Sequence, residues 1–202
     1  MTIKVPRLNG LVLSGGKSTR MGRDKGALVY HRSDQRSHLS GLLKPYCQEV
    51  YVSCNPAQTP ALAGMSLLVD SVEGAGPVVG ILSAFKQEPH AAWLVVACDL
   101  PFLSALSLAA LTEGRNPHKL ATAFNNPDTG FPEPLITIWE PRSYAPLLEN
   151  LGKGITCPRK VLINGDIQLL SAPDIKELQN INHAEEYDKI VGSGQTRASA
   201  SG

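Results

Sequence analysis

The sequence predicts one α/β domain in which helices flank a mostly parallel sheet. Short apolar runs typical of strands alternate with segments of helical periodicity, which is the order that such a sheet requires. Residues 93–97 are almost continuously apolar, so we expect a central strand that is covered on both faces. The length of 202 residues suits a single domain with a substantial core.

The chain up to Asp70 contains three expected strands and one helix. Residues 11–13 form a short apolar run directly before a pair of glycines, and residues 50–54 and 67–69 are two further runs of strand type. Between the first two strands, four apolar side chains recur at the spacing of one helical face. They are Leu39, Leu42, Leu43 and Tyr46.

A second helix is expected to open at Pro77, because the missing N–H of proline has no partner to lose in a first helical turn. Its expected buried residues are Val78, Ile81, Leu82 and Phe85. After the strand at 93–97, Ser104 is placed to cap a third helix and Gly114 to end it.

The second half contains two more expected strands, at residues 120–124 and 135–139. A helix follows, marked by Tyr144, Leu147, Leu148 and Leu151. A last helix is expected after Asn182, with Glu185 placed for a capping box. We expect residues 1–191 to form the domain and the small, polar residues 192–202 to be a disordered tail.

Composition excludes several classes of protein. The net charge of +1 gives no electrostatic argument for nucleic acid or an anionic membrane, so we expect neither as a partner. The four cysteines form no C-x-x-C pair, which argues against structural zinc, and Cys54 and Cys98 are expected to be buried, reduced thiols. The first residues do not resemble a signal peptide, and no apolar stretch is long enough for a membrane span. A cytoplasmic protein is therefore expected.

The segment LSGGKSTRMGRDKG, residues 13–26, carries the strongest functional signal. It directly follows a strand, and Gly15 and Gly16 allow the backbone N–H groups to approach an anion. Four cations in the same segment add positive charge, as a triphosphate requires: Lys17, Arg20, Arg23 and Lys25. A P-loop is the nearest alternative, but its first glycine would fall on Leu11, and Gly10 is one residue too early.

Two aspartates follow expected strands. Asp70 ends the third strand before a Gly-Pro turn, and ligands of open α/β sheets bind outside the carboxyl ends of strands. Asp99 follows the central strand, where a carboxylate is a natural ligand for Mg²⁺. The alternatives are that Asp70 only caps a loop and that Asp99 only caps a helix.

The glycine-rich string resembles the molybdenum cofactor guanylyltransferase family, whose loop reads roughly L-A-G-G-x-S-x-R-M-G-x-D-K. The segments around Asp70 and Asp99 are similar to that family's D-x-x-x-x-x-G-P-x-x-G-I-x-x-A and A-C-D-x-P-F-L. The resemblance implies a Rossmann-like fold of the nucleotide-diphospho-sugar transferase type over residues 1–191. It also implies transfer of a nucleoside monophosphate to a phosphorylated acceptor, with release of pyrophosphate. The residues that it assigns to catalysis are Lys25, Asp99 and Arg20, with Mg²⁺ on Asp99. The residues that it assigns to the nucleotide are Leu13, Ser14, Gly15, Gly16, Lys25, Asn55, Asp70 and Asp99.

The chain departs from the family's pattern at three places. Ser14 replaces the usual alanine, and residues 31–38, HRSDQRSH, replace a tight G-x-P-L turn. Asn180 and Asn182 resemble the family's N-x-N-T-P-E-E, but His183 and Ala184 stand in place of Thr-Pro. We therefore expect Asn182 to act mainly as a helix cap.

The resemblance implies in-line attack by an acceptor phosphate on the α-phosphorus of a nucleoside triphosphate. Such transfer needs positioning and charge stabilisation rather than covalent help, which agrees with the lack of an obvious catalytic histidine. GTP and molybdopterin are the expected substrates. The alternatives are another nucleoside triphosphate such as CTP, another phosphorylated acceptor such as a sugar phosphate, or a non-catalytic nucleotide-binding protein. A molybdoenzyme chaperone or another cofactor-synthesis protein is the expected kind of partner.

Overall fold

A computed structural model describes residues 5–14 and 34–180, and it is built around one seven-stranded sheet. The spatial order of the strands is β3-β2-β1-β4-β6-β5-β7. Only β6 runs antiparallel to its neighbours β4 and β5. The strands are β1 (Leu8–Leu13), β2 (Val50–Cys54), β3 (Leu67–Val69), β4 (Ala92–Ala97), β5 (Ala121–Asn126), β6 (Phe131–Trp139) and β7 (Gln168–Ser171). The prediction of a mostly parallel α/β sheet is confirmed.

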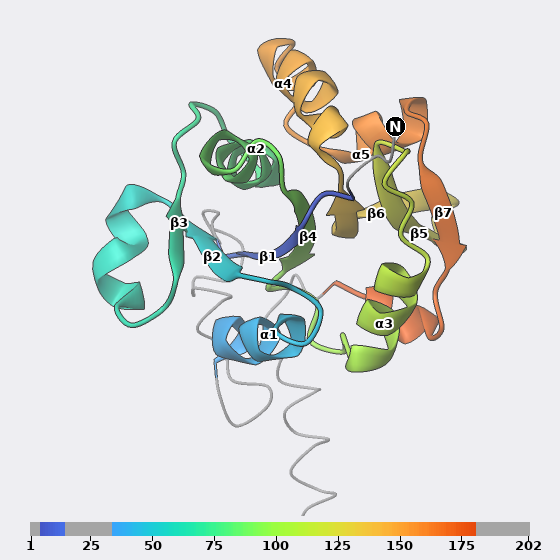
Figure 1. Ribbon diagram of the computed structural model, residues 1–202, viewed down its shortest axis with the longest axis horizontal. Coiled ribbons are helices and arrows are strands. Elements are labelled where there is room, and N and C mark those ends of the chain that lie inside the picture. Colours follow the sequence, from blue (N-terminus) through green and yellow to red (C-terminus); the bar gives the residue numbers. More distant parts are fainter. Residues whose placement is uncertain (1–4, 15–33, 181–202) are drawn as a thin grey trace, which may run out of the picture.

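Helices cover both faces of the sheet (Figure 1). On one face lie α2 (Pro77–Gln87), α4 (Tyr144–Gly152) and α5 (Arg159–Asn164), and on the other lie α1 (Gln35–Leu43), α3 (Ala105–Glu113) and the 3-10 turn η4 (Ile175–Leu178). Strand β4 separates two apolar cores, since Trp93 and Val95 pack on the α2 side and Leu94 and Val96 on the α1 side. All six of its residues are buried, as expected for a central strand.

Most expected elements are present, with shifted ends. The helix with Leu39 and Leu43 ends at Leu43, so Tyr46 lies in the following turn, where its hydroxyl donates to the carbonyl of Ala105. Ser104 caps α3 by accepting from the N–H of Leu106, and Gly114 ends it. The elements not predicted are α5, β7 and the short turns η2 (Pro56–Leu62), η3 (Pro141–Ser143) and η4. The helix expected after Asn182 and the tail at 192–202 lie outside the described residues.

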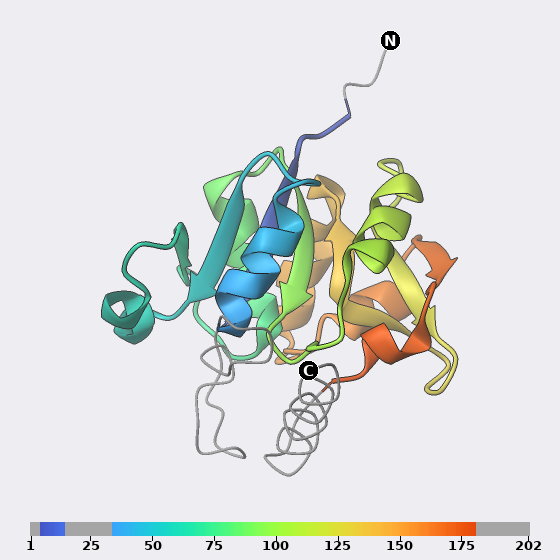
Figure 2. The same cartoon turned by 90° about the horizontal axis from the view of Figure 1, so that it is seen from below.

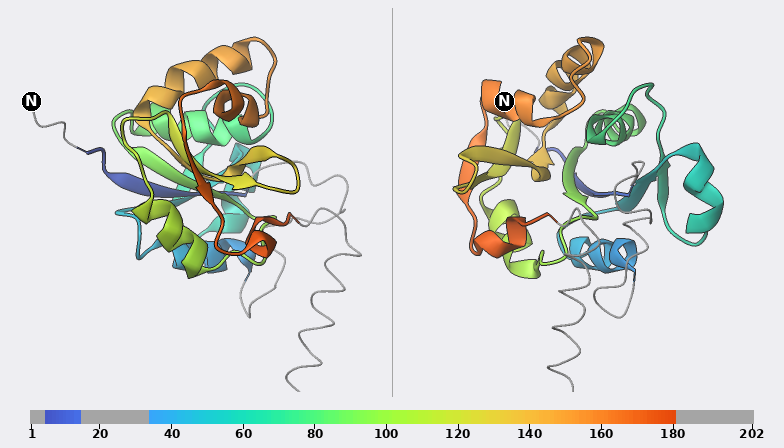
Figure 3. Two further views of the ribbon diagram at one scale, coloured as in Figure 1. Left: turned by 90° about the vertical axis from the view of Figure 1, so that its right-hand side faces the viewer. Right: turned by 180° about the vertical axis from the view of Figure 1, so that it is seen from behind.

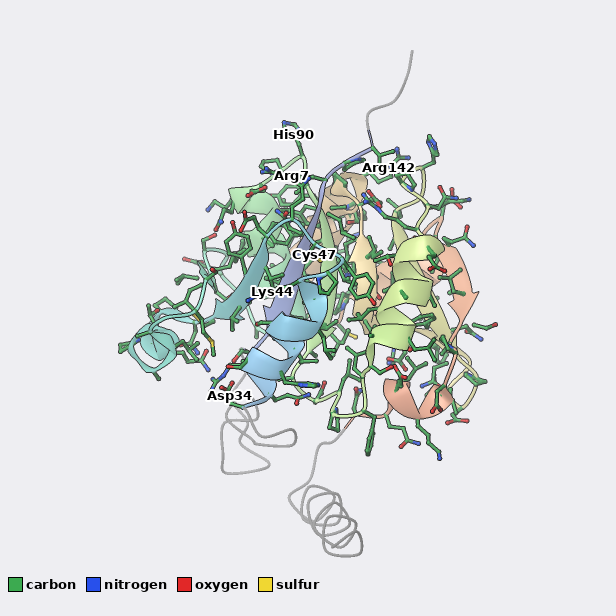
Figure 4. The ribbon with its side chains drawn as sticks, turned by 60° about the horizontal axis from the view of Figure 1, so that its bottom comes forward. Arg7, Asp34, Lys44, Cys47, His90 and Arg142 are labelled. Carbon is green, nitrogen blue, oxygen red and sulfur yellow. The ribbon has the colours of Figure 1, made fainter. Side chains whose placement is uncertain are left out.

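A buried ion pair fixes the amino edge of the central strands. Arg115 donates from Nε to Glu140 Oε1 at 2.7 Å, and Glu140 is fully buried directly after β6. The same guanidinium donates to the carbonyl of Pro6 at 2.9 Å, so it also holds the segment that leads into β1. Figure 4 shows Arg7, His90 and Arg142 at this end of the molecule and Asp34 at the opposite end. The pair thus stabilises the edge that lies away from the predicted site.

The four cysteines all lie in the described part of the chain and none forms a disulfide bond. Cys54 and Cys98 are buried, as expected. None of the described helices is long and apolar enough to cross a membrane.

Candidate nucleotide site

Polar residues follow the carboxyl ends of four neighbouring parallel strands. Ser14 follows β1, Asn55 follows β2, Asp70 follows β3, and Asp99 comes two residues after the end of β4. In Figure 2, β2 and β4 both point towards the lower edge of the sheet. Because the strand order is β3-β2-β1-β4, these residues lie along that edge in the order Asp70, Asn55, Ser14, Asp99. The start of the glycine-rich segment therefore lies between the two aspartates.

The backbone that enters the glycine-rich segment is held from both sides. The carbonyl of Leu13 accepts from the N–H of Cys98 at 3.2 Å, and the N–H of Ser14 donates to the carbonyl of Ser53 at 3.2 Å. The hydroxyl of Ser14 also accepts from the guanidinium of Arg36 at 3.4 Å. Both Leu13 and Ser14 are 8% exposed. The first residues assigned to the nucleotide thus have fixed positions between β2 and β4.

Asp70 is half-buried and has a defined orientation. Its N–H donates to the carbonyl of Cys54 at 2.9 Å, which extends the β2–β3 ladder by one residue. Its Oδ1 accepts from the hydroxyl of Ser53 at 3.0 Å. Burial raises the pKa of the Asp70 carboxyl, and the hydrogen bond from Ser53 opposes that rise. The carboxylate is therefore oriented by Ser53 and only partly hydrated.

Asp99 lies in a loop that is held by two buried polar side chains from other elements. Gln35, fully buried at the start of α1, donates from Nε2 to the carbonyl of Leu100 at 3.1 Å. Glu177 of η4, 6% exposed, accepts from both the backbone N–H and the hydroxyl of Ser104. The described residues contain no group of three or more His, Cys, Asp or Glu side chains that could hold a metal. Asp99 is thus a single carboxylate on a fixed loop.

Gln35 and Arg36 belong to the polar stretch at residues 31–38 that departs from the family's pattern. Within the described part of that stretch, Asp34 caps α1 by accepting from the N–H of Ser37, and the buried Gln35 and Arg36 form its first turn. The two buried side chains contact the Asp99 loop and Ser14, respectively. Two residues of the divergent segment therefore help to hold the predicted site residues in place.

Asn55 forms a capping box in η2. Its side-chain oxygen accepts from the N–H of Gln58 at 3.1 Å, and its own N–H donates to the side chain of Gln58 at 3.0 Å. The side-chain oxygen of Asn55 therefore caps η2, and its side-chain NH₂ group is the candidate donor to a ligand.

The Gly-Pro turn that follows Asp70 needs glycine at two positions. Gly74 and Gly76 have φ values of 146° and 80°, which side chains rarely adopt. A Cβ at Gly76 would also lie 3.1 Å from the carbonyl oxygen of Thr156. Pro77 occupies the first turn of α2, as predicted.

Several predicted site residues lie outside the described residues. They are Gly15, Gly16, Arg20, Lys25 and Asn182. Asn180 is the last described residue, it is half-buried, and its Oδ1 has no hydrogen-bond partner in the described ranges 5–14 and 34–180.

A second polar cluster at the same edge was not predicted. Asn126, at the end of β5, donates from Nδ2 to Glu133 Oε1 at 2.7 Å, and Arg159 of α5 lies 3.5 Å from Glu133 Oε2. Glu133 is 5% exposed. It comes from the β5–β6 hairpin, which projects from the sheet in the left view of Figure 3. Glu133 could have been noticed as the one carboxylate in the apolar, proline-containing run FPEPLITIW. Its contact with Arg159 could not have been predicted, because the two residues are 26 positions apart and no sequence pattern connects them.

The fold and this row of residues define an α/β protein whose ligand site lies at the carboxyl edge of a mainly parallel sheet. Comparison with known proteins gives the family. The chain belongs to the family of MobA-like NTP transferase domains, whose model matches residues 10–172, and it is a nucleotidyltransferase.

Two relatives and one solved structure illustrate the similarity. The chain is 37% identical over 186 residues to a "Molybdenum cofactor biosynthesis bifunctional protein" of Synechocystis sp., covering 91% of this chain but 53% of that protein. It is 32% identical over 176 residues to a "Molybdenum cofactor guanylyltransferase" of Pseudomonas fluorescens, covering 85% and 88% of the two chains. Its fold matches that of "Molybdopterin-guanine dinucleotide biosynthesis protein A" of Archaeoglobus fulgidus with a TM-score of 0.77 at 18% identity, over 93% of this chain and 99% of that one.

Proposed function

We propose that this nucleotidyltransferase acts in molybdenum cofactor biosynthesis and transfers GMP from GTP to molybdopterin, with release of pyrophosphate. The observation that carries the proposal is the family match over residues 10–172. The names of the Synechocystis and Pseudomonas relatives supply the substrates. We further propose that residues 1–191 form the transferase domain, that residues 192–202 are a disordered tail, and that the protein acts in the cytoplasm.

The order of residues along the carboxyl edge supports a specific placement of the nucleotide. Adjacent strands lie about 4.8 Å apart, so the edge from Asp70 to Asp99 spans three strand steps, or roughly 14 Å. The phosphates bind the glycine-rich segment after Ser14, the base end lies towards Asn55 and Asp70, and the reacting α-phosphate lies towards Asp99. The amides of Gly15 and Gly16 and the cations Lys25 and Arg20 neutralise the triphosphate.

The residues present fit a divalent cation. Mg²⁺ takes one or two protein carboxylates and completes its coordination with water and substrate phosphates, and Asp99 offers one half-buried carboxylate on a fixed loop. When bound, the ion offsets the charge that develops on the phosphates during transfer. The roles of Gln35 and Glu177 are to keep the Asp99 loop in one conformation, through Leu100 and Ser104.

The reaction balances without covalent help from the protein. An oxygen of the acceptor phosphate forms a bond to the α-phosphorus, the bond between that phosphorus and the α–β bridging oxygen breaks, and pyrophosphate leaves. An acceptor that is already ionised has no proton to give up, so no general base is needed. Asn126, Glu133 and Arg159 lie at the same edge beyond β4, on the side away from Asp70, and we assign that side to the acceptor.

Nucleotide preference tests this proposal. Thermal unfolding with Mg²⁺ and each of GTP, CTP, ATP and UTP measures which nucleotide stabilises the native state most. We expect the largest shift with GTP. Equal shifts for all four would contradict the guanine assignment, and the largest shift with CTP would favour the alternative of a CTP-dependent enzyme.

The acceptor and the protein partners are proposed on the same basis. Another phosphorylated acceptor, such as a sugar phosphate, is the second candidate. A molybdoenzyme chaperone or another cofactor-synthesis protein is the proposed partner. Pyrophosphate release with molybdopterin but not with sugar phosphates is the expected result.

A further inference from the structure

Ser53, which was not among the predicted site residues, contacts both halves of the candidate nucleotide site. It lies on β2, one residue before the strand ends, and it is 2% exposed. Its hydroxyl donates to Asp70 Oδ1 at 3.0 Å, and its carbonyl accepts from the N–H of Ser14 at 3.2 Å. One buried residue therefore holds the carboxylate at the base end of the site and the backbone at the start of the glycine-rich segment.

Close packing fixes Ser53 itself. Gly80 of α2 lies so near that a Cβ built on it would be 2.5 Å from Ser53 Oγ and 3.3 Å from Ser53 Cβ. Within the described ranges, Ser53 is the one residue that gives Asp70 a side-chain hydrogen bond. The hydroxyl thus has little freedom, and it orients one carboxylate oxygen of Asp70, while the other oxygen accepts no hydrogen bond from residues 5–14 and 34–180.

We propose that Ser53 is a positioning residue for nucleotide recognition, which orients Asp70 so that its carboxylate accepts hydrogen bonds from the nucleoside part of the donor. This inference rests on the proposed function, because it requires that a nucleotide binds along this edge. Because Ser53 is buried and its hydroxyl donates to Asp70, we expect its side chain to act through Asp70 on the nucleoside rather than on the phosphates. Its carbonyl keeps the glycine-rich segment in register with β2, and that contact involves no side-chain atom.

The chemistry of a carboxylate explains why the orientation of Asp70 would affect nucleoside binding. An ionised carboxylate accepts hydrogen bonds only, so it suits the N–H and O–H donors of a nucleoside and not its carbonyl oxygens. Burial favours the protonated form of Asp70, and the hydrogen bond from Ser53 favours the ionised form. Among the described residues, the titratable and charged groups on the neighbouring elements are Cys54 on β2, which interacts electrostatically with both Asp70 and Arg36, and Lys86 on α2, whose ammonium donates to the carbonyl of Ser71. Removing the hydroxyl of Ser53 therefore leaves a less oriented and more easily protonated Asp70.

The test compares two probes in calorimetric titrations with Mg²⁺: GTP, which uses the whole site, and inorganic tripolyphosphate, which uses only the phosphate part. Ser53→Ala should weaken GTP binding about five- to tenfold, since a hydrogen bond to a charged group is lost, and leave tripolyphosphate binding unchanged. The weakening should begin at a higher pH than in the unaltered protein as pH falls, because the pKa of Asp70 rises. Ser143→Ala is the matched control, since Ser143 is also fully buried and donates to the carbonyl of Glu140 at the other edge of the sheet.

A double-mutant cycle separates positioning from general loosening. In an Asp70→Asn background, Ser53→Ala should cause no further loss of GTP affinity. An equal loss in both backgrounds, an equal loss for tripolyphosphate, or full GTP affinity in Ser53→Ala would overturn the inference while leaving the proposed function intact. An unaltered protein that binds neither GTP nor any other nucleoside triphosphate would overturn both. If Ser53→Ala does not fold, Asp70→Asn alone decides, because unchanged GTP affinity in that variant also overturns the inference.

Discussion

Substituting alanine for Gly80 tests how closely α2 packs against the strands that carry the site. The new Cβ would lie 2.5 Å from Ser53 Oγ and 2.8 Å from Leu13 Cδ2, and both partners are buried. Overpacking of this kind costs about 1–3 kcal/mol, and the better helix propensity of alanine returns about 0.5–1 kcal/mol. The difference lies between about 0 and 2.5 kcal/mol, and because both contacted side chains are buried we expect the upper part of that range, a loss of about 1.5–2.5 kcal/mol that should lower Tm by roughly 3–10 °C in a domain of this size.

Two comparisons separate the packing cost at Gly80 from the general effect of replacing a helical glycine with alanine. Gly41→Ala lies inside α1, where no described atom outside the helix's own neighbouring backbone is within 4 Å of the new Cβ, so it should raise the free energy of unfolding by about 0.5–1 kcal/mol. In a Ser53→Ala background the nearest contact of the new Cβ at position 80 is gone, so Gly80→Ala should cost less there, by about 0.5 kcal/mol or more. Calorimetric or denaturant unfolding gives the free energy of unfolding of the unaltered protein, the three single variants and the double variant. A Gly80→Ala protein as stable as the unaltered one, or strict additivity with Ser53→Ala, would refute the packing argument.

Three further variants test the buried ion pair, the Asp99 loop and the glycine-rich segment. Arg115→Ala leaves the buried carboxylate of Glu140 without its cation and should cost about 3–5 kcal/mol in denaturant unfolding; a cost below about 1 kcal/mol would show that the pair is dispensable. Glu177→Gln weakens the contacts to Ser104 that hold the Asp99 loop, so it should lower stability by about 1 kcal/mol and reduce turnover more than GTP affinity; an unchanged turnover would exclude this positioning role. Lys25→Ala should weaken GTP binding by about 1.5–3 kcal/mol in a titration at little cost to stability, and full affinity in a folded variant would show that this lysine does not contact the triphosphate.

The parallel half of the sheet was predictable because its strands are short, apolar and separated by turn residues. Residues 50–54 and 67–69 were predicted with the bounds that the structure has, and the apolar run at 93–97 gave a central strand. The antiparallel direction of β6 was not predictable, because an apolar pattern does not record strand direction. Its first residues were missed because Pro132 and Pro134 argue against a strand; they are tolerated because β4 pairs only with residues 136–139.

Strand β7 and helix α5 were not predicted because their sequences have weak patterns of apolar residues and capping residues. Strand β7 is a four-residue edge strand whose residues are alternately half-buried and exposed, so it lacks a buried run. Helix α5 has only six residues and no side-chain cap.

The candidate site was predictable where a residue directly follows a strand. Asp70 and Asp99 were found in this way. Their supports were not found, because Ser53, Gln35 and Glu177 reach the site through contacts between residues that are 17, 65 and 73 positions apart.

Pyrophosphate release by the Asp99→Asn variant tests the central claim, that this edge of the sheet carries a metal-dependent nucleotidyl transfer. The substitution is nearly isosteric and removes the negative charge that a hard cation requires. With GTP, molybdopterin and Mg²⁺, the unaltered protein should release pyrophosphate. The variant should remain folded, keep part of its GTP affinity and lose turnover. Turnover at the unaltered rate in the variant, or no pyrophosphate release by the unaltered protein with any nucleoside triphosphate, would contradict the account.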